Sequence, residues 1–298
     1  MRIGWIGTGI MGAPMAGHLL QGGHTLGVFN RSREKASGLI AGGAAWYDSP
    51  RALAEASEVV FSIVGHPRDV EAVYLGPEGV LAAARRPGVV VDMTTSQPAL
   101  ARRLAAAAAE RGVTSLDAPV SGGDIGARKA TLVIMVGGDR GAFDQVSPLL
   151  GLLGRTVAHM GPAGAGQHTK MCNQILIAGT MIGVCEALLY ASRAGLDAAG
   201  VIDVVSQGAA GSWAISNLGP RMIAGDFTPG FMVEHFIKDM GIALAEAGAM
   251  GLALPGLALV HQLYLAVQAQ GGGRLGTQAL LRALRTLNGL PADNPGVP

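Results

Sequence analysis

The sequence predicts an α/β protein with two domains. The first is built on a doubly wound, mostly parallel sheet, and a long helix joins it to an all-α C-terminal domain. Short apolar runs alternate with helical segments, a glycine cluster follows the first run, and strand signals end near residue 162. Such alternation is typical of parallel strands covered by helices on both faces. We therefore expect domains at 1–162 and 163–298.

The elements of the first domain follow from this alternation. Residues 2–6 form an apolar run, and residues 25–29 form a second one after a helical segment at 10–21. Two parallel strands joined by a helix make a right-handed β-α-β unit. The pattern then predicts helices at 50–56 and 98–111, with strands at 58–64, 88–92, 113–117, 131–136 and 156–159.

The second domain is expected to be helical beyond the glycine-rich loop at 161–166. A long helix at 167–194 comes first. Its apolar stretch 175–191 contains Glu186, which favours a buried helix over a membrane span. Further helices are predicted at 198–207, 231–248, 257–270 and 275–287.

Composition argues against several kinds of partner and site. The 298 residues are 49% hydrophobic and 14% charged with a net charge of +1, so we expect neither nucleic acid nor a membrane as partner. The cysteines and histidines show no spacing typical of metal ligands, and we predict no metal site. The N-terminus enters a strand without a signal peptide, and we expect a cytoplasmic protein.

A glycine turn between the first strand and the first helix predicts dinucleotide binding. Glycine there permits a tight turn, close approach of a pyrophosphate and close packing of helix on strand, while the helix N-terminus offers N–H groups. The expected cofactor contacts are Gly7, Thr8, Gly9, Ile10, Met11 and Gly12 in this turn, together with Val64 at the end of a later strand.

The end of the second strand predicts NADP(H) in preference to NAD(H). Enzymes that use NAD usually place an acid there to bind the ribose 2′-hydroxyl. This chain has Asn30, followed by Arg31, which can bind a 2′-phosphate and stack on adenine, and Ser32, which can donate a hydrogen bond. NAD(H) is the alternative cofactor. Arg33 is explained equally well as a solvated charge on a helix surface and as a residue with a functional role.

A second glycine-rich segment follows the strand at 113–117. Ser121 offers a hydroxyl group, and Gly122 and Gly123 offer unobstructed backbone N–H groups. Together they suit a carboxylate, and the alternative is an ordinary turn.

Lys170 stands at the start of a strongly apolar helix, with Asn173 and Gln174 one turn later. Four of the 22 lysines and arginines are lysines, and a lysine can release a proton where an arginine cannot. We expect Lys170 to transfer protons, with a surface lysine as the alternative. Phe231 and Lys238 are further candidates for cofactor contacts. The alternatives, a core aromatic residue for Phe231 and a surface lysine for Lys238, are equally consistent with the sequence.

Taken in order, these segments resemble the β-hydroxyacid dehydrogenase family. The resemblance rests on GTGIMGAPM at 7–15, DAPVSGG at 117–123, GAGQHTKMCNQ at 164–174 and the segment 229–239, which ends in Lys-Asp. These blocks extend over nearly the whole chain and are highly specific in combination. The resemblance implies a Rossmann domain, a helical domain and a homodimer or homotetramer.

The resemblance also implies roles for single residues. Lys170 would be the general acid/base, Ser121 and the two glycines after it would hold a substrate carboxylate, and either Asn173 or Gln174 would orient the substrate. Thr95 and Lys238 match positions that contact the cofactor in the family.

The implied activity is hydride transfer between NADPH and a small carboxylate-bearing aldehyde or alcohol. Tartronate semialdehyde, succinic semialdehyde, glyoxylate and 3-hydroxyisobutyrate all fit. The alternatives are an NAD-preferring 3-hydroxyisobutyrate dehydrogenase, a decarboxylating enzyme of the 6-phosphogluconate type, and a non-catalytic NADP-bound scaffold or reader. Imine reductases share the fold but typically lack a lysine at this position, so Lys170 argues against them and against a scaffold.

Overall fold

The computed structural model describes residues 1–292. The chain divides into two compact units, one comprising residues 1–170 and the other beginning at Met171. The division falls inside helix α8 (Ala165–Arg193), beyond the loop at which the sequence placed it. A single helix therefore contributes its first turns to one unit and its remainder to the other.

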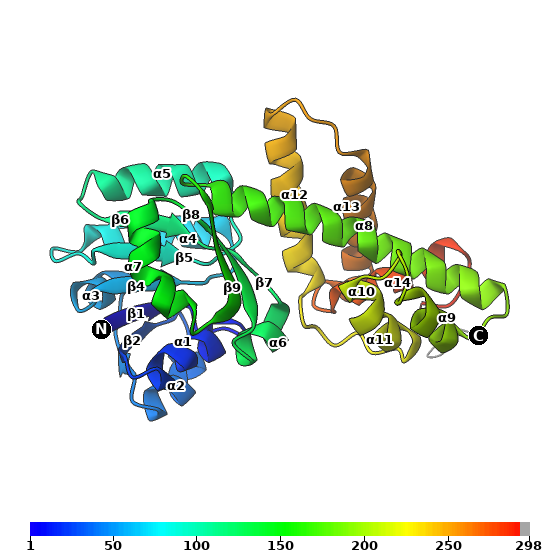
Figure 1. Cartoon of the computed structure of the whole chain (residues 1–298), viewed down its shortest axis with the longest axis horizontal. Helices are drawn as coiled ribbons and strands as arrows, with labels where there is room; N and C mark the ends of the chain where they lie inside the picture. Colours follow the sequence, from blue (N-terminus) through cyan, green and yellow to red (C-terminus); the bar gives the residue numbers. More distant parts are fainter. Residues whose placement is uncertain (293–298) are drawn as a thin grey trace. The chain divides into compact units, whose positions relative to one another are not determined.

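The first unit is built on one sheet (Figure 1). The strand order is β3-β2-β1-β4-β5-β6-β8-β7, with β9 paired to β8. Strands β1 to β6 pair in parallel, whereas β8 runs antiparallel to β6 and β7, so the predicted doubly wound, mostly parallel sheet is confirmed. The strands are β1 (Arg2–Ile6), β2 (Thr25–Phe29), β3 (Ala45–Trp46), β4 (Val59–Ser62), β5 (Val89–Asp92), β6 (Thr114–Asp117), β7 (Val120–Ser121), β8 (Leu132–Gly137) and β9 (Gly154–Gly161).

Helices cover both faces of this sheet. One core contains side chains of α1 (Gly12–Gln21), α2 (Ser37–Ala41), α6 (Gly123–Arg128) and α7 (Arg140–Leu150). The other contains side chains of α3 (Pro50–Glu55), α4 (Pro67–Leu75) and α5 (Pro98–Ala109). Short 3₁₀ turns are η1 (Arg33–Ala36) and η2 (Val80–Ala82).

Successive side chains of a strand point to opposite faces, and β4 shows this directly. Val59 and Phe61 lie in the first core, while Val60 lies in the second. Burying each such side chain contributes roughly 1.5–3 kcal/mol, so every central strand stabilises both layers at once.

The parallel strands end in register at one edge of the sheet, here called the carboxyl edge. Ile6 pairs with Phe29 on one side and with Ser62 on the other, Ser62 pairs with Asp92, and Asp92 pairs with Asp117. The loops that follow these residues therefore lie next to one another. The strand order reverses between β1 and β4, the position at which such sheets bind ligands.

The second unit is helical, as predicted. Its core includes an edge-to-face contact between Phe236 and Tyr264, whose ring centroids are 5.0 Å apart. Besides most of α8, it contains α9 (Ala198–Val205), α10 (Trp213–Asn217), α11 (Gly219–Ile223), α12 (Val233–Ala249), α13 (Pro255–Val267), η3 (Gln268–Gly272), η4 (Thr277–Ala279) and α14 (Leu280–Leu287).

The long helix α8 is apolar on two sides. By length and composition it could cross a membrane, and 39% of its most apolar window is buried within this chain. Met181 and Cys185 are fully buried, whereas Leu176 and Tyr190 are 70% and 75% exposed. The buried helix expected from the sequence is therefore buried on one face only.

Some elements carry weak sequence signals and were not predicted. Helix α7 contains Pro148, which breaks the helical pattern, and α4 begins at Pro67. Strand β7 has two residues, and α6 follows it directly. The helix expected from residue 275 begins at Leu280 after a 3₁₀ turn.

Candidate active site

The glycine turn follows β1 at the carboxyl edge. Gly7 has a φ of +96°, and a Cβ there would lie 2.0 Å from the carbonyl oxygen of Ile63. A Cβ on Gly12 would lie 1.9 Å from the carbonyl oxygen of Gly7. The fold itself requires these two glycines. A Cβ on the exposed Gly9 would meet no other atom within 4 Å, so the backbone there is open to a ligand such as a pyrophosphate.

The rest of the turn also fits a dinucleotide. Helix α1 has no side-chain cap at its N-cap residue Met11, and its N-terminal N–H groups and partial positive charge suit a phosphate. Ile10 is 58% exposed, which places an apolar side chain on the open side of the turn. The hydroxyl of Thr8 is buried and has no hydrogen-bond partner among residues 1–292.

Asn30 holds the neighbouring loop with both ends of its amide. Its Oδ1 accepts a hydrogen bond from the backbone N–H of Thr8 at 3.2 Å, and its Nδ2 donates to the carbonyl of Ser32 at 2.9 Å. A carboxylate could not make the second bond, so this position suits asparagine. Asn30 thereby fixes the glycine turn relative to the loop that presents Arg31.

Arg31 points into solvent beside an acid of the next loop. Its side chain is 82% exposed, and its Nη1 lies 3.3 Å from Oδ1 of Asp69. The other oxygen of Asp69 accepts from the N–H of His66 and caps α4. Exposed ion pairs add little stability, so the guanidinium can turn toward another anion at small cost. Arg33 instead lies over the ring of Trp46 at 5.4 Å, as a surface residue would.

The loops that carry Val64 and Thr95 are hydrogen-bonded to each other. The N–H of Val64 donates to Oγ1 of Thr94 at 2.9 Å. The N–H of Thr94 and the hydroxyl of Ser62 both donate to Oδ1 of Asp92, at 3.1 and 2.9 Å. Burial raises the pKa of Asp92 to about 6, against the effect of these donors.

Lys170 is 6% exposed in the second turn of α8. The first turn of that helix is bound to the end of β6. The two carboxylate oxygens of Asp117 accept from the N–H groups of Gly164 and Gln167, at 2.7 and 2.8 Å. Burial raises the pKa of Asp117, and these N–H groups oppose that rise.

The side chain of Gln167 connects the same helix to the loop after β5. Its Oε1 accepts from the N–H of Ser96 at 2.9 Å, and its Nε2 donates to the carbonyl of Thr94 at 2.7 Å. Thr95 therefore lies between two residues that are held by the helix of Lys170.

The second glycine segment differs from its predicted form. Ser121 ends a separate short strand, β7, and does not continue β6. Gly122 and Gly123 have φ values of +128° and +61°, which favour glycine. Asp124 follows them, and its carboxylate accepts from Arg128 at 2.6 Å, which offsets its charge near the two glycine N–H groups.

In the second unit, the two amides after Lys170 have different surroundings. Gln174 is fully buried; its Oε1 accepts from Nδ2 of Asn173 at 2.7 Å, and its Nε2 donates to Asp239 at 2.7 Å. The other oxygen of Asp239 lies 3.0 Å from Nζ of Lys238. Both ends of the Gln174 amide are thus engaged within the chain, whereas the half-buried Asn173 still presents its oxygen. These bonds fit a positioning role for Gln174, and the orienting role of either amide stays a prediction.

Phe231 packs within the second unit. Its ring lies 6.4 Å from that of His235 and 5.9 Å from that of Phe236. These contacts are those of an aromatic residue at the edge of a core, and its contact with a nicotinamide stays a prediction.

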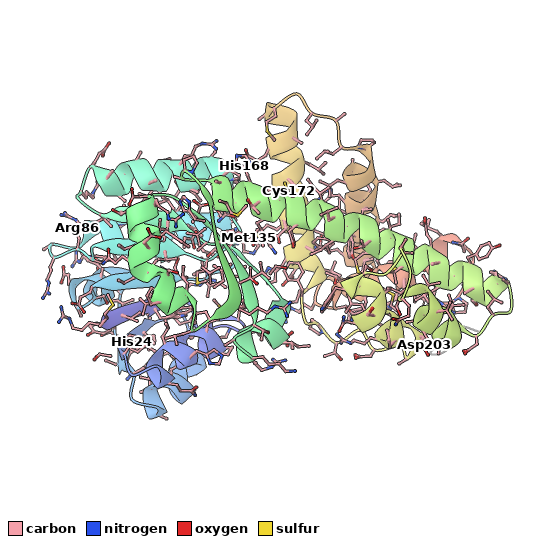
Figure 2. The ribbon with its side chains drawn as sticks, in the orientation of Figure 1. His24, Arg86, Met135, His168, Cys172 and Asp203 are labelled. Atoms are coloured by element: carbon pink, nitrogen blue, oxygen red, sulfur yellow. The ribbon has the colours of Figure 1, made fainter. Side chains whose placement is uncertain are left out.

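His168 is the histidine closest in sequence to Lys170. Nε2 of His168, on α8, lies 3.4 Å from a guanidinium nitrogen of Arg102 at the surface (Figure 2). Within residues 1–292, no group of three His, Cys, Asp or Glu side chains could hold a metal ion.

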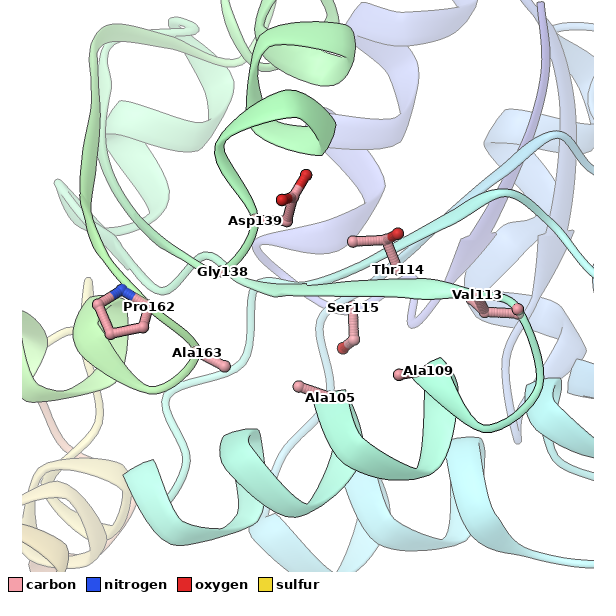
Figure 3. A pocket seen from close by; sticks show the side chains of 10 residues that line it. Ala105, Ala109, Val113, Thr114, Ser115, Gly138, Asp139, Pro162 and Ala163 are labelled. Atoms are coloured by element: carbon pink, nitrogen blue, oxygen red, sulfur yellow. The ribbon is translucent and has the colours of Figure 1, made fainter.

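A shallow cavity of about 610 Å³ lies at a different place in the first unit (Figure 3). It contacts the start of β6, whereas Asp117 and the carboxyl edge lie at the end of that strand. Its lining consists mainly of small side chains: Ala105, Ala109, Gly112, Val113, Thr114, Ser115, Gly138, Asp139, Pro162 and Ala163.

Sequence reasoning missed the residues that hold the site together. Asp92 and Asp117 end adjacent parallel strands, and Gln167 opens the helix of Lys170. Acids at neighbouring strand ends were a usable signal, because such ends meet at one edge of the sheet. Asp239 lies in the segment 229–239 that carries the family resemblance, but the sequence gave no sign that it pairs with Gln174.

Comparisons with known proteins find similarity over both units of the chain. Residues 2–161 match the family described as the NAD-binding domain of 6-phosphogluconate dehydrogenase, and residues 164–284 match that of NADP-dependent 3-hydroxyisobutyrate dehydrogenase. A probable mitochondrial 3-hydroxyisobutyrate dehydrogenase-like protein of Arabidopsis thaliana is 53% identical over 294 residues, covering 98% of this chain and 88% of that protein.

Two further similarities extend over nearly full length. The 2-hydroxy-3-oxopropionate reductase of Escherichia coli is 41% identical over 287 residues, covering 96% of this chain and 98% of that enzyme. The solved structure of Mycobacterium tuberculosis 3-hydroxyisobutyrate dehydrogenase with L-serine superimposes with a TM-score of 0.87 at 33% identity, covering 95% of this chain and 99% of that one.

Proposed function

The chain belongs to the β-hydroxyacid dehydrogenase family, and on that premise we propose an NADP(H)-dependent enzyme that interconverts a small carboxylate-bearing aldehyde and its alcohol. The observation that carries the proposal is Lys170, an amine buried to 6% exposure at the start of α8. Burial of an amine costs free energy, and proton transfer is a reason to retain it. The proposed substrates are tartronate semialdehyde, succinic semialdehyde, glyoxylate, and methylmalonate semialdehyde with its alcohol, 3-hydroxyisobutyrate.

The residues at the carboxyl edge would hold the cofactor. The open backbone at Gly9 and the start of α1 would receive the pyrophosphate, and Arg31 would exchange Asp69 for the 2′-phosphate. The absence of an acid at Asn30 supports NADP(H) over NAD(H). When bound, the reduced nicotinamide supplies the hydride that reduces the aldehyde carbon.

The chain's own residues would manage charge and protons. The N–H groups of Gly122 and Gly123, with the hydroxyl of Ser121, would bind the substrate carboxylate. The ammonium group of Lys170 would stabilise the negative charge that grows on the aldehyde oxygen and then give it a proton. In the oxidative direction the neutral amine would take the proton of the hydroxyl group. Asn173 would hold the reacting oxygen in line.

Substitution of Lys170 tests the proposal. Lys170→Ala should lower kcat by about 10²-fold or more, and Lys170→Arg should not restore it because arginine does not release a proton. The affinity for NADPH, measured by fluorescence titration, should change little. Lys129→Ala, at an exposed lysine, is the control. Near-wild-type turnover of Lys170→Ala would refute the proposed role.

We also propose that the exposed face of α8 packs against a second copy of this chain. Leu176 and Tyr190 are exposed there with Gly179 and Gly183 between them, which allows close packing of helices. The exposed Glu186 on the same helix argues against lipid as the partner. Light scattering should give an oligomer for the wild type, and Leu176→Glu should shift it toward the monomer. A monomeric wild type would contradict this assignment.

A further inference from the structure

Gln167 is buried beneath the loop that carries Thr95, and both ends of its amide are in use. Its exposure is zero, and its amide presents one acceptor to the N–H of Ser96 and one donor to the carbonyl of Thr94. Its own backbone N–H is held by Asp117. From a single position on α8, Gln167 therefore makes hydrogen bonds on both sides of Thr95 in the loop after β5 and to the last residue of β6.

Thr94 extends this connection to the loop after β4. Its hydroxyl accepts from the N–H of Val64, and its N–H donates to Asp92. The carbonyl of Thr94 is the group that accepts from Gln167. Two loops with predicted cofactor contacts, at Val64 and Thr95, are thus joined to the helix turn that precedes Lys170.

We propose that Gln167 is a positioning residue that fixes the Thr95 loop relative to the amine of Lys170. This inference rests on the proposed function, because the distance between the Thr95 loop and the amine of Lys170 matters only if the cofactor and the proton donor act on one substrate. A small misplacement of reacting groups can cost up to about 10²-fold in rate, so a buried amide that spans loop and helix has a direct effect on hydride transfer.

Hydrogen exchange tests the connection without relying on activity. Gln167→Met keeps the length of the side chain and removes both bonds, so the N–H of Ser96 should exchange faster, and peptides covering 93–97 should show it. Bound NADPH should protect this peptide less in the variant than in the wild type. Ser57→Ala is the matched control. It removes a buried hydrogen bond from the Ser57 hydroxyl, just before β4, to the carbonyl of Leu53 on α3, away from the carboxyl edge.

Single-turnover oxidation of bound NADPH tests the consequence. Gln167→Met should slow hydride transfer by about 10-fold or more while the Kd for NADPH changes less, and the deuterium isotope effect on kcat should rise. Gln167→Glu adds a readout that loss of structure would not produce. A protonated carboxyl can donate to Thr94 and accept from Ser96, but a carboxylate cannot donate, so its rate relative to wild type should fall as pH rises.

The outcomes separate the two proposals. Unchanged exchange at 93–97, or a single-turnover rate of Gln167→Met within twofold of that of Ser57→Ala, would overturn the positioning role. If the wild type transfers hydride to none of the proposed substrates, the proposed function fails, and the exchange of 93–97 with NADPH alone still decides whether Gln167 holds the loop.

Discussion

The end of β1 and the ends of β5 and β6 lie along one edge of the sheet and are built in opposite ways. At the end of β1 the chain presents bare backbone, and a side chain on Gly9 would meet nothing within 4 Å. At the ends of β5 and β6 it buries two carboxylates, Asp92 and Asp117, which accept hydrogen bonds from the chain's own N–H groups. The first end is open to a ligand, and the other two hold loops and a helix in place.

This difference indicates where two kinds of residue lie in the fold, those proposed to contact the cofactor and those that hold them in position. The groups proposed to contact the cofactor are mainly exposed glycines and polar side chains at the rim of the sheet. Groups that determine their positions are buried one layer deeper and are fully hydrogen-bonded, as Gln167 is. The predictions that follow test this division, beginning with the largest expected effect.

Two glycines of the same turn should respond differently to an added methyl group. Gly12→Ala should lower the free energy of unfolding by about 3 kcal/mol or more, since its Cβ would lie 1.9 Å from a carbonyl oxygen. Gly9→Ala should leave stability nearly unchanged and weaken NADPH binding about 10-fold. Thermal melts measure the change in stability, and fluorescence titrations measure the affinity for NADPH. Unchanged NADPH affinity in Gly9→Ala would break the assignment of the β1 end to the ligand.

The buried carboxylate at the end of β5 should make stability depend on pH. The pKa of Asp92 in the folded chain, about 6, lies above its ordinary value of 3.8, so the folded protein keeps a proton that the unfolded chain releases. The free energy of unfolding should therefore fall as pH rises from about 4 to about 6, by on the order of 3 kcal/mol.

Asp92→Asn isolates this contribution. The amide oxygen can still accept from Thr94, and the variant should be the more stable protein at pH 7, with a smaller pH slope. Asp117, whose pKa is also raised, contributes a slope of the same sign that the variant retains. Urea unfolding of both proteins at several pH values measures how the free energy of unfolding depends on pH. An identical slope in both proteins would show that folding does not raise the pKa of Asp92.

At the rim, Arg31→Ala should raise KM for NADPH about 10-fold and KM for NADH far less, because the 2′-phosphate is the group that distinguishes them. Steady-state kinetics with NADPH and with NADH measures the two KM values. An equal effect on the two cofactors would remove the basis for preferring NADP(H).

The smallest effect is expected at Asp69. Asp69→Asn keeps an oxygen for the N–H of His66 and removes the charge that attracts Arg31. KM for NADPH should fall about two- to threefold with little change for NADH, since exposed ion pairs are weak. A rise in KM for NADPH would mean that Asp69 helps to present the guanidinium group.

The same division explains what the sequence could predict. The alternation of strands and helices and the glycine turn are local patterns, and Lys170 is noticeable because lysine is rare here. Asn30 could be identified as the residue in place of an acid, but its bonds to Thr8 and Ser32 depend on the folded loops.

The buried connections could not be predicted because their partners are far apart in the chain. Gln167 and Ser96 are joined only when the sheet forms, as are Gln174 and Asp239 in the second unit. A glutamine at the start of a helix has no distinctive pattern in sequence. Its importance comes from burial and from the two groups that face it.

The most direct test of the central claim, that this chain transfers hydride to a small carboxylate-bearing aldehyde, is a comparison of kcat/KM. Tartronate semialdehyde, succinic semialdehyde, glyoxylate and methylmalonate semialdehyde are each tested with NADPH and with NADH, and L-serine and 3-hydroxyisobutyrate with the oxidised cofactors. We expect oxidation of NADPH with at least one semialdehyde, at a kcat/KM about 10-fold or more above that with NADH. Turnover of none of these compounds with either cofactor would contradict the account.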